Sequence, residues 1–77
     1  MPAMINYRGE LLRISPKDPK KLEHSATNGR TWITRFSGSS SVGEFSDIMY
    51  NGTELLATTS KGLFYSKTDG RTWIRRH

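Results

Sequence analysis

One stretch occurs twice in this chain of 77 residues, first as Ser25-Ala26-Thr27-Asn28-Gly29-Arg30-Thr31-Trp32-Ile33-Thr34-Arg35-Phe36 and again, 41 residues later, as Ser66-Lys67-Thr68-Asp69-Gly70-Arg71-Thr72-Trp73-Ile74-Arg75-Arg76-His77. Eight of the twelve positions are identical, far beyond what chance gives two windows in so short a chain. The likeness extends upstream, where Tyr7-Arg8-Gly9-Glu10-Leu11-Leu12 matches Tyr50-Asn51-Gly52-Thr53-Glu54-Leu55-Leu56. We therefore interpret the chain as two copies of one supersecondary unit, at 4–36 and 45–77.

Each copy is predicted to form a β-meander of four short antiparallel strands. Its apolar residues are mostly of strand-forming types, and turn signals such as Asn51-Gly52 separate the runs. The first copy carries a three-residue insertion, which falls in the Pro- and Lys-rich segment 15–21. The expected strands are 4–7, 10–15, 21–25 and 31–36 in the first copy, and 45–50, 54–59, 62–66 and 72–76 in the second.

The two copies are expected to form a single domain over 1–77, because a chain of this length supports only one small core. Residues 37–44 are rich in Gly and Ser, a composition typical of a flexible linker. The chain contains no cysteine, seven Asp and Glu and two His, so a disulfide framework is excluded and candidates for a metal site are few. We expect no metal and no cofactor.

The repeated run resembles the Asp-box, or bacterial neuraminidase repeat, which has the form Ser-x-Asp-x-Gly-x-Thr-Trp. This motif recurs in sialidase-type β-propellers and in many non-enzymatic repeat proteins. The resemblance implies blade-like β-structure, with the motif on the hairpin between the third and fourth strands of each unit. One position departs from the pattern, because Thr27 and Thr68 occupy the place of the Asp, and Asn28 and Asp69 follow one residue later.

The motif is interpreted as a staple that holds the turn. Gly29 and Gly70 supply the positive φ that closes the turn, the Ser and Thr hydroxyls bond backbone groups across it, and each Trp packs beneath it. The residues assigned this structural role are Ser25, Asn28, Gly29, Thr31, Trp32, Ser66, Asp69, Gly70, Thr72 and Trp73.

One such unit is too small to be stable alone, so each unit must bury its apolar face against the other unit or against another chain. We expect a compact sandwich or barrel-like monomer with Trp32, Phe36, Leu55, Phe64 and Trp73 in the shared core. The alternative is that each chain supplies two blades of an oligomeric β-propeller, for example a trimer. A homo-oligomer is therefore possible, and the solution mass distinguishes the two arrangements.

Charge is unevenly distributed along the chain, although the formal total is +5. Residues 1–36 carry seven Lys or Arg against three acids, 37–60 carry three acids and no base, and 61–77 carry five bases against one acid. Basic ends of this kind suit a nucleic acid or another polyanion. They equally suit the outward Lys and Arg with which small β-proteins block edge-to-edge association.

An enzyme is not expected. Glycosidase chemistry needs two carboxylates held roughly 5 to 10 Å apart in a shielded cleft, and the scattered acids show no such spacing. The histidines have no nucleophile beside them in a recognisable pattern, and both are interpreted as surface side chains.

We expect a non-enzymatic interaction or binding module for protein or glycan, with a lectin-like carbohydrate binder and a polyanion binder as alternatives. The N-terminus lacks the features of a signal peptide, and no apolar run is long enough to span a bilayer, so a cytoplasmic location is the default expectation. The residues selected as candidates for binding are Tyr7, Tyr50, Tyr65, Arg30, Arg35, Arg71 and Arg75.

Overall fold

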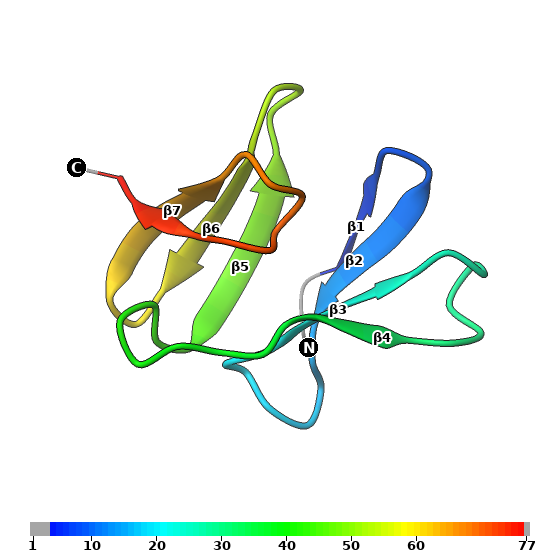
Figure 1. Cartoon of the computed structure of the whole chain (residues 1–77), viewed down its shortest axis with the longest axis horizontal. Helices are drawn as coiled ribbons and strands as arrows, with labels where there is room; N and C mark the ends of the chain where they lie inside the picture. Colours follow the sequence, from blue (N-terminus) through cyan, green and yellow to red (C-terminus); the bar gives the residue numbers. More distant parts are fainter. Residues whose placement is uncertain (1–3, 77) are drawn as a thin grey trace.

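Each repeat forms its own four-stranded antiparallel sheet (Figure 1) in the computed structural model, which describes residues 4–76. The predicted all-β fold is confirmed, and the described residues contain no helix. Residues 1–3 and His77, which belong to the expected 1–77 domain, lie outside this range. The strands are β1 (Met4–Tyr7), β2 (Glu10–Ile14), β3 (Leu22–Ser25) and β4 (Ile33–Phe36) in the first sheet, and β5 (Phe45–Tyr50), β6 (Leu55–Thr59), β7 (Gly62–Ser66) and β8 (Ile74–Arg75) in the second.

Both sheets are meanders with the strands in chain order, and their pairing registers correspond. Leu12 pairs with Ile5 and His24 in the first sheet, as Leu56 pairs with Met49 and Tyr65 in the second. The outer strands start later than the sequence indicates, at Ile33 and Ile74. The reason is that the preceding Thr and Trp are used in the turn.

The Thr that replaces Asp in the motif supports the same turn in both copies. In the first, Ser25 Oγ accepts from the backbone N–H groups of Thr27 and Gly29, and Thr27 Oγ1 accepts from that of Thr31 at 2.9 Å. Ser66 and Thr68 repeat these bonds in the second copy. Asn28 and Asp69 have positive φ (58° and 63°), followed by glycines at 89°. Each Trp donates its indole N–H to the carbonyl of its own turn glycine.

The two sheets pack face to face through β5, which contacts β1 and β2 (Figure 1). They share one core and do not close into a barrel. Leu55, Phe64 and Trp73 are buried as predicted, and Phe36 packs against the cluster at 5.8 Å from the ring of Phe45. The other buried apolar side chains are Tyr7, Leu12, Ile14, Leu22, Val42, Phe45, Ile48 and Ala57.

The prediction that Trp32 belongs to the shared core is wrong. Trp32 is half-buried and lies outside the core cluster, with the Arg13 guanidinium 3.8 Å from its ring centroid. Its sheet presents this side chain on the face that the second sheet does not cover. Trp73 has the same turn but lies between the sheets, where its ring meets Phe45 at 5.5 Å.

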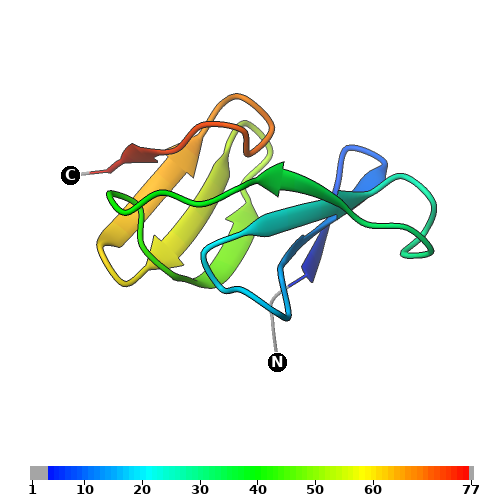
Figure 2. The same ribbon diagram turned by 60° about the horizontal axis from the view of Figure 1, so that its bottom comes forward.

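The connection at 37–44 has a defined structure, although its composition suggested flexibility. It runs from β4 across to β5 (Figure 2). The backbone N–H groups of Val42 and Gly43 both bond the Ser39 carbonyl, and the Val42 side chain enters the core. The inserted segment of the first repeat packs here too, because the Phe45 N–H donates to the Pro19 carbonyl at 2.8 Å.

Neither a membrane-crossing helix nor a metal-binding group of side chains is found within residues 4–76. His24 is half-buried rather than a simple surface residue, and its Nδ1 atom is buried without a hydrogen-bond partner in this part of the chain.

Candidate functional site

A polar cleft of about 320 Å³ lies where the two repeats meet. Three elements from different parts of the chain line it: the β1–β2 hairpin, strand β4, and the turn between β7 and β8. The lining side chains are Tyr7, Arg8, Glu10, Arg35, Asp69 and Arg71. The first four come from the first repeat and the last two from the second, so the cleft exists only because the repeats are docked together.

Asp69 organises the cleft from the tip of the second turn. Tyr7 donates its hydroxyl hydrogen to Asp69 Oδ1, across the boundary between the repeats. Arg71 lies 3.3 Å from Oδ2 and Arg8 lies 3.6 Å from Oδ1. The hydrogen bond from Tyr7, with the nearby arginines adding to it, holds the pKa of the Asp69 carboxyl below its usual range. Asp69 is therefore ionised at neutral pH.

Arg35 ties the two sheets together beneath the cleft. Its side chain is only 5% exposed, and Nη2 bonds Glu10 Oε1 at 2.7 Å while Nη1 donates to the Asp69 carbonyl at 2.6 Å. The backbone conformation, rather than this approach, explains why glycine follows Asp69. A Cβ on Gly70 would lie 3.6 Å from Arg35 Cγ and 3.4 Å from Leu55 Cδ1, at a φ of +89° that L side chains rarely adopt.

Tyr7, which lines the cleft, packs against a second tyrosine that lies outside the lining. The rings of Tyr7 and Tyr50 meet edge to face with centroids 4.7 Å apart. Tyr7 is buried, whereas Tyr50 remains 37% exposed. Burial, together with the hydrogen bond to Asp69, raises the pKa of the Tyr7 hydroxyl, so Tyr7 stays a neutral donor at physiological pH.

The groups available to a ligand are the guanidiniums of Arg8 and Arg71, whose side chains are 66% and 60% exposed. Both are held near Asp69, while the Arg35 side chain is 5% exposed and bonds Glu10 and the Asp69 carbonyl. With three arginines against two carboxylates, the lining carries an excess of positive charge. The arrangement can bind an anionic group at the two exposed guanidiniums and hydroxyls at the neighbouring carboxylates.

The structure brings together four of the residues that were selected from sequence, namely Tyr7, Tyr50, Arg35 and Arg71. Tyr7, Arg35 and Arg71 line the cleft, Tyr50 packs on Tyr7 beside it, and the other three lie elsewhere. Tyr65 lies under the Arg76 guanidinium at 4.3 Å, Arg75 extends along Gly62, and Arg30 sits on the first turn.

Sequence reasoning missed Arg8 and Glu10, and it gave Asp69 a role in the turn only. One signal was present for Arg8: it precedes Gly9 in a two-residue turn, where charged side chains point to solvent.

We expect Tyr7→Phe to raise the pKa of the Asp69 carboxyl toward its ordinary value, because the variant removes the hydrogen bond that lowers it. A carboxyl with a lowered pKa in the folded state stabilises the fold above about pH 4, and this contribution is lost as pH falls through the folded pKa. The variant should therefore lose the part of the stability that the hydrogen bond to Asp69 contributes above this pH. Carboxyl carbon NMR shifts followed from pH 7 to pH 2 measure the midpoint.

Tyr50→Phe is the matched control, since the Tyr50 hydroxyl donates to the Gly52 carbonyl and not to Asp69. An Asp69 midpoint that is the same in wild type and Tyr7→Phe would contradict this account.

Comparison with family models, with curated proteins and with solved structures finds no match to this chain. The resemblance to the Asp-box repeat therefore stays a prediction that rests on the residues of the two turns.

Proposed function

We propose that this chain is a non-enzymatic binding module that holds an acid-bearing ligand, such as an acidic saccharide, in the polar cleft between its two repeats. The observation that carries the proposal is the pair of exposed guanidiniums, on Arg8 and Arg71, held on either side of the ionised Asp69. A guanidinium presents a planar set of donors that matches a carboxylate or a phosphate.

A saccharide is favoured over a simple anion because the cleft offers acceptors as well as donors. Glu10 and Asp69 can accept from sugar hydroxyls, and Tyr7 supplies an aromatic ring in the same lining. Sites for small polar ligands combine a few convergent polar groups with an apolar wall in this way.

A binding role is favoured over catalysis by the state of the carboxylates. A general acid works best when its pKa is raised toward the operating pH, whereas the pKa of Asp69 is lowered. The Glu10 carboxylate is already engaged by Arg35 at 2.7 Å.

Titration with sodium glucuronate, followed by backbone NMR shifts, tests the proposal, with neutral glucose as the comparison. We expect glucuronate to shift residues of the cleft with a dissociation constant of about 1 mM, and glucose to have no effect. Arg71→Gln should weaken binding about tenfold, because a hydrogen bond to a charged group contributes roughly 1.5–3 kcal/mol.

The chain supplies its own control in Arg30, which occupies the position of Arg71 in the first turn but does not line the cleft. Arg30→Gln should bind as wild type does. Equal losses in the two variants, or equal responses to glucuronate and glucose, would overturn the proposal.

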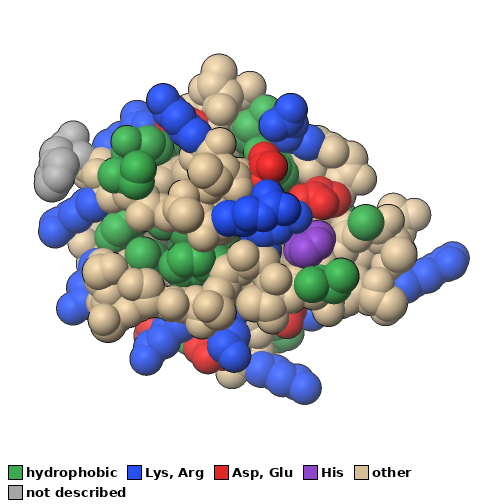
Figure 3. Space-filling view, in the orientation of Figure 1, with side chains coloured by type: hydrophobic (Ala, Val, Ile, Leu, Met, Phe, Trp, Pro, Cys, Tyr) green, Lys and Arg blue, Asp and Glu red, His purple; other side chains and the backbone are tan. Residues whose placement is uncertain are grey.

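The polyanion alternative is tested by adding a single-stranded oligonucleotide at roughly 50 mM salt, where phosphate contacts are strongest. On the face shown in Figure 3, Lys and Arg side chains project at separate points and form no single patch that would favour this alternative. Two of the guanidiniums are already stacked within the protein, Arg13 on Trp32 and Arg76 on Tyr65.

A further inference from the structure

The matching registers allow the two faces of each sheet to be compared residue by residue. We call one face the leading face; it carries Ile5, Leu12, Ile14 and Leu22 in the first sheet and, at the corresponding positions, Met49, Leu56, Thr58 and Leu63 in the second. The opposite, trailing face carries Asn6, Leu11, Arg13 and Glu23 in the first sheet and Tyr50, Leu55, Ala57 and Phe64 in the second.

Within the chain, the leading face of the first sheet packs against the trailing face of the second. Leu12 and Leu22 are fully buried there, as are Leu55 and, at 1% exposure, Ala57. The repeats therefore point in the same direction and are not related by a two-fold axis. An arrangement of this kind always leaves one leading and one trailing face over.

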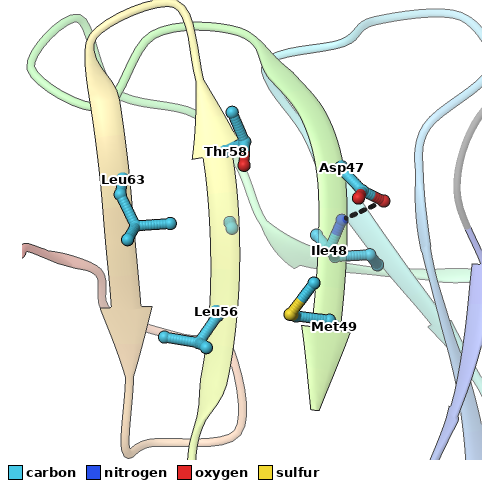
Figure 4. A pocket seen from close by; sticks show the side chains of 7 residues that line it. Asp47, Ile48, Met49, Leu56, Thr58 and Leu63 are labelled. Atoms are coloured by element: carbon cyan, nitrogen blue, oxygen red, sulfur yellow. Dashed lines mark hydrogen bonds between the residues drawn. The ribbon is translucent and has the colours of Figure 1, made fainter. Parts of the chain in front are cut away.

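The leading face left over belongs to the second sheet, and it is apolar and uncovered within residues 4–76. Met49 is 51% exposed and Leu63 is 43% exposed, although their counterparts Ile5 and Leu22 pack in the interior. Figure 4 shows Met49, Leu56 and Leu63 pointing to one side of the sheet. They line a shallow pocket of about 170 Å³. Hydrophobic side chains also appear at the surface over this sheet in Figure 3.

The second repeat also contains the donor side of a contact like the one that Arg35 makes between the repeats. Arg76 and Glu54 form an ion pair that corresponds to Arg35 and Glu10. Arg35 also donates to the carbonyl of Asp69, on the turn of the next repeat. No described residue supplies such a carbonyl to Arg76.

The complementary half lies on the trailing side of the first repeat. Gly29 is packed by Leu11 and Trp32, just as Gly70 is packed by Leu55 and Trp73. Gly70 has Arg35 as its third neighbour, whereas no arginine approaches Gly29. The first turn therefore resembles the second turn in its packing, but no arginine of the described residues lies beside it as Arg35 lies beside the second turn.

We propose that a second copy of this chain docks on the leading face of the second sheet through its own first sheet, head to tail. Arg76 then donates to the Asn28 carbonyl of the neighbouring copy, as Arg35 donates to that of Asp69. The contact is heterologous, so it extends to further copies until a ring closes. It also provides the additional neighbours that repeat arrays normally need for stability.

The assembly should be reversible, because the receiving face is more polar than the face used within the chain. Arg13 and Glu23 form an ion pair where the second sheet has Ala57 and Phe64, and Arg13 covers Trp32. Desolvating this pair reduces the gain from burying Met49 and Leu63.

Sedimentation velocity of the 77-residue chain from about 10 μM to about 1 mM tests the proposal. We expect the mass to rise from that of one chain, 8.8 kDa, to at least twice that value. Leu63→Lys places a charge on the leading face and should remain a single chain at all concentrations. Ile33→Lys is the matched control. Ile33 also lies on a leading face, that of the first sheet, but its side chain is 61% exposed although the rest of that face is covered. This variant should therefore assemble as wild type does.

A pair of variants establishes the direction of the contact. Asn6→Glu places a charge on the exposed trailing face of the first sheet and should also stay a single chain. Mixed in equal amounts, Leu63→Lys and Asn6→Glu should form a one-to-one dimer that grows no further, because one intact leading face and one intact trailing face remain. A wild-type chain that stays single up to 1 mM would overturn the proposal. Assembly that Leu63→Lys abolishes and Asn6→Glu leaves intact would also overturn it, because it indicates a symmetric dimer.

Discussion

Trp73→Ala is expected to lower the free energy of unfolding by about 3–5 kcal/mol, the usual cost of truncating a buried Trp. Trp73 is buried between the sheets with its ring 5.5 Å from that of Phe45, and its indole N–H donates to the Gly70 carbonyl at 2.9 Å. Removing it opens a cavity in the shared core and leaves a carbonyl without its partner. Urea denaturation followed by circular dichroism measures the loss.

Trp32→Ala is the matched control, because Trp32 makes the same indole bond to its own turn, at 3.1 Å. It lies outside the core under the Arg13 guanidinium, so we expect a loss of only about 1–2 kcal/mol. Domains of this size are marginally stable, so a loss at the upper end of this range leaves no folded Trp73→Ala protein to measure. Trp73→Phe, which keeps an aromatic ring in the core, then provides the comparison. Equal losses at positions 32 and 73 would show that the two tryptophans are equally placed, contrary to the structure.

Arg35→Gln is expected to lower the free energy of unfolding by about 3 kcal/mol. Arg35 is 5% exposed and bonds both Glu10 and the Asp69 carbonyl, so the change leaves a largely buried carboxylate without its charge partner. Removing one member of a buried ion pair costs roughly 3–5 kcal/mol, and the partial exposure of Glu10 places this case at the lower end. Chemical denaturation of the single variant measures the effect.

A double-mutant cycle with Glu10→Gln isolates the ion pair. We expect the loss in the double variant to be smaller than the sum of the two single losses, because the second change removes the charge that the first left unpaired. Arg76→Gln, at the corresponding position of the second repeat, should also be destabilising, because it leaves the Glu54 carboxylate, whose side chain is only 10% exposed, without its charge partner. Strict additivity in the cycle would mean that Arg35 acts only through its contact with the Asp69 turn.

The strands were predictable because the signals that define them are local. Turn residues recur at matching places in both copies, and the runs between them are rich in strand-forming types. The burial of Trp32 could not be predicted in the same way. The two Trp-containing turns are nearly identical in sequence, and only the order in which the sheets stack determines which of them is covered.

The cleft was only partly predictable for a similar reason. Tyr7 and Tyr50 align in the sequence, yet Tyr7 pairs with Glu10 and Tyr50 with Leu55, because the second hairpin is longer. This difference places the two rings on opposite faces of their sheets, so that they meet between the repeats. The roles of Arg8 and Glu10 depend on contacts across that boundary, and no local pattern in the sequence specifies them.

The threonine that replaces Asp in each turn has a consequence for how the molecule responds to acid. Thr27 and Thr68 bond their turns through hydroxyl groups, which do not titrate between pH 2 and pH 10. The hydrogen bond from Tyr7 to Asp69 between the repeats depends instead on a carboxyl whose pKa is lowered, and this bond weakens as pH falls through that pKa. Acid should therefore remove the bond from Tyr7 to Asp69 between the repeats, while the hydroxyl bonds within each turn and the shared apolar core remain.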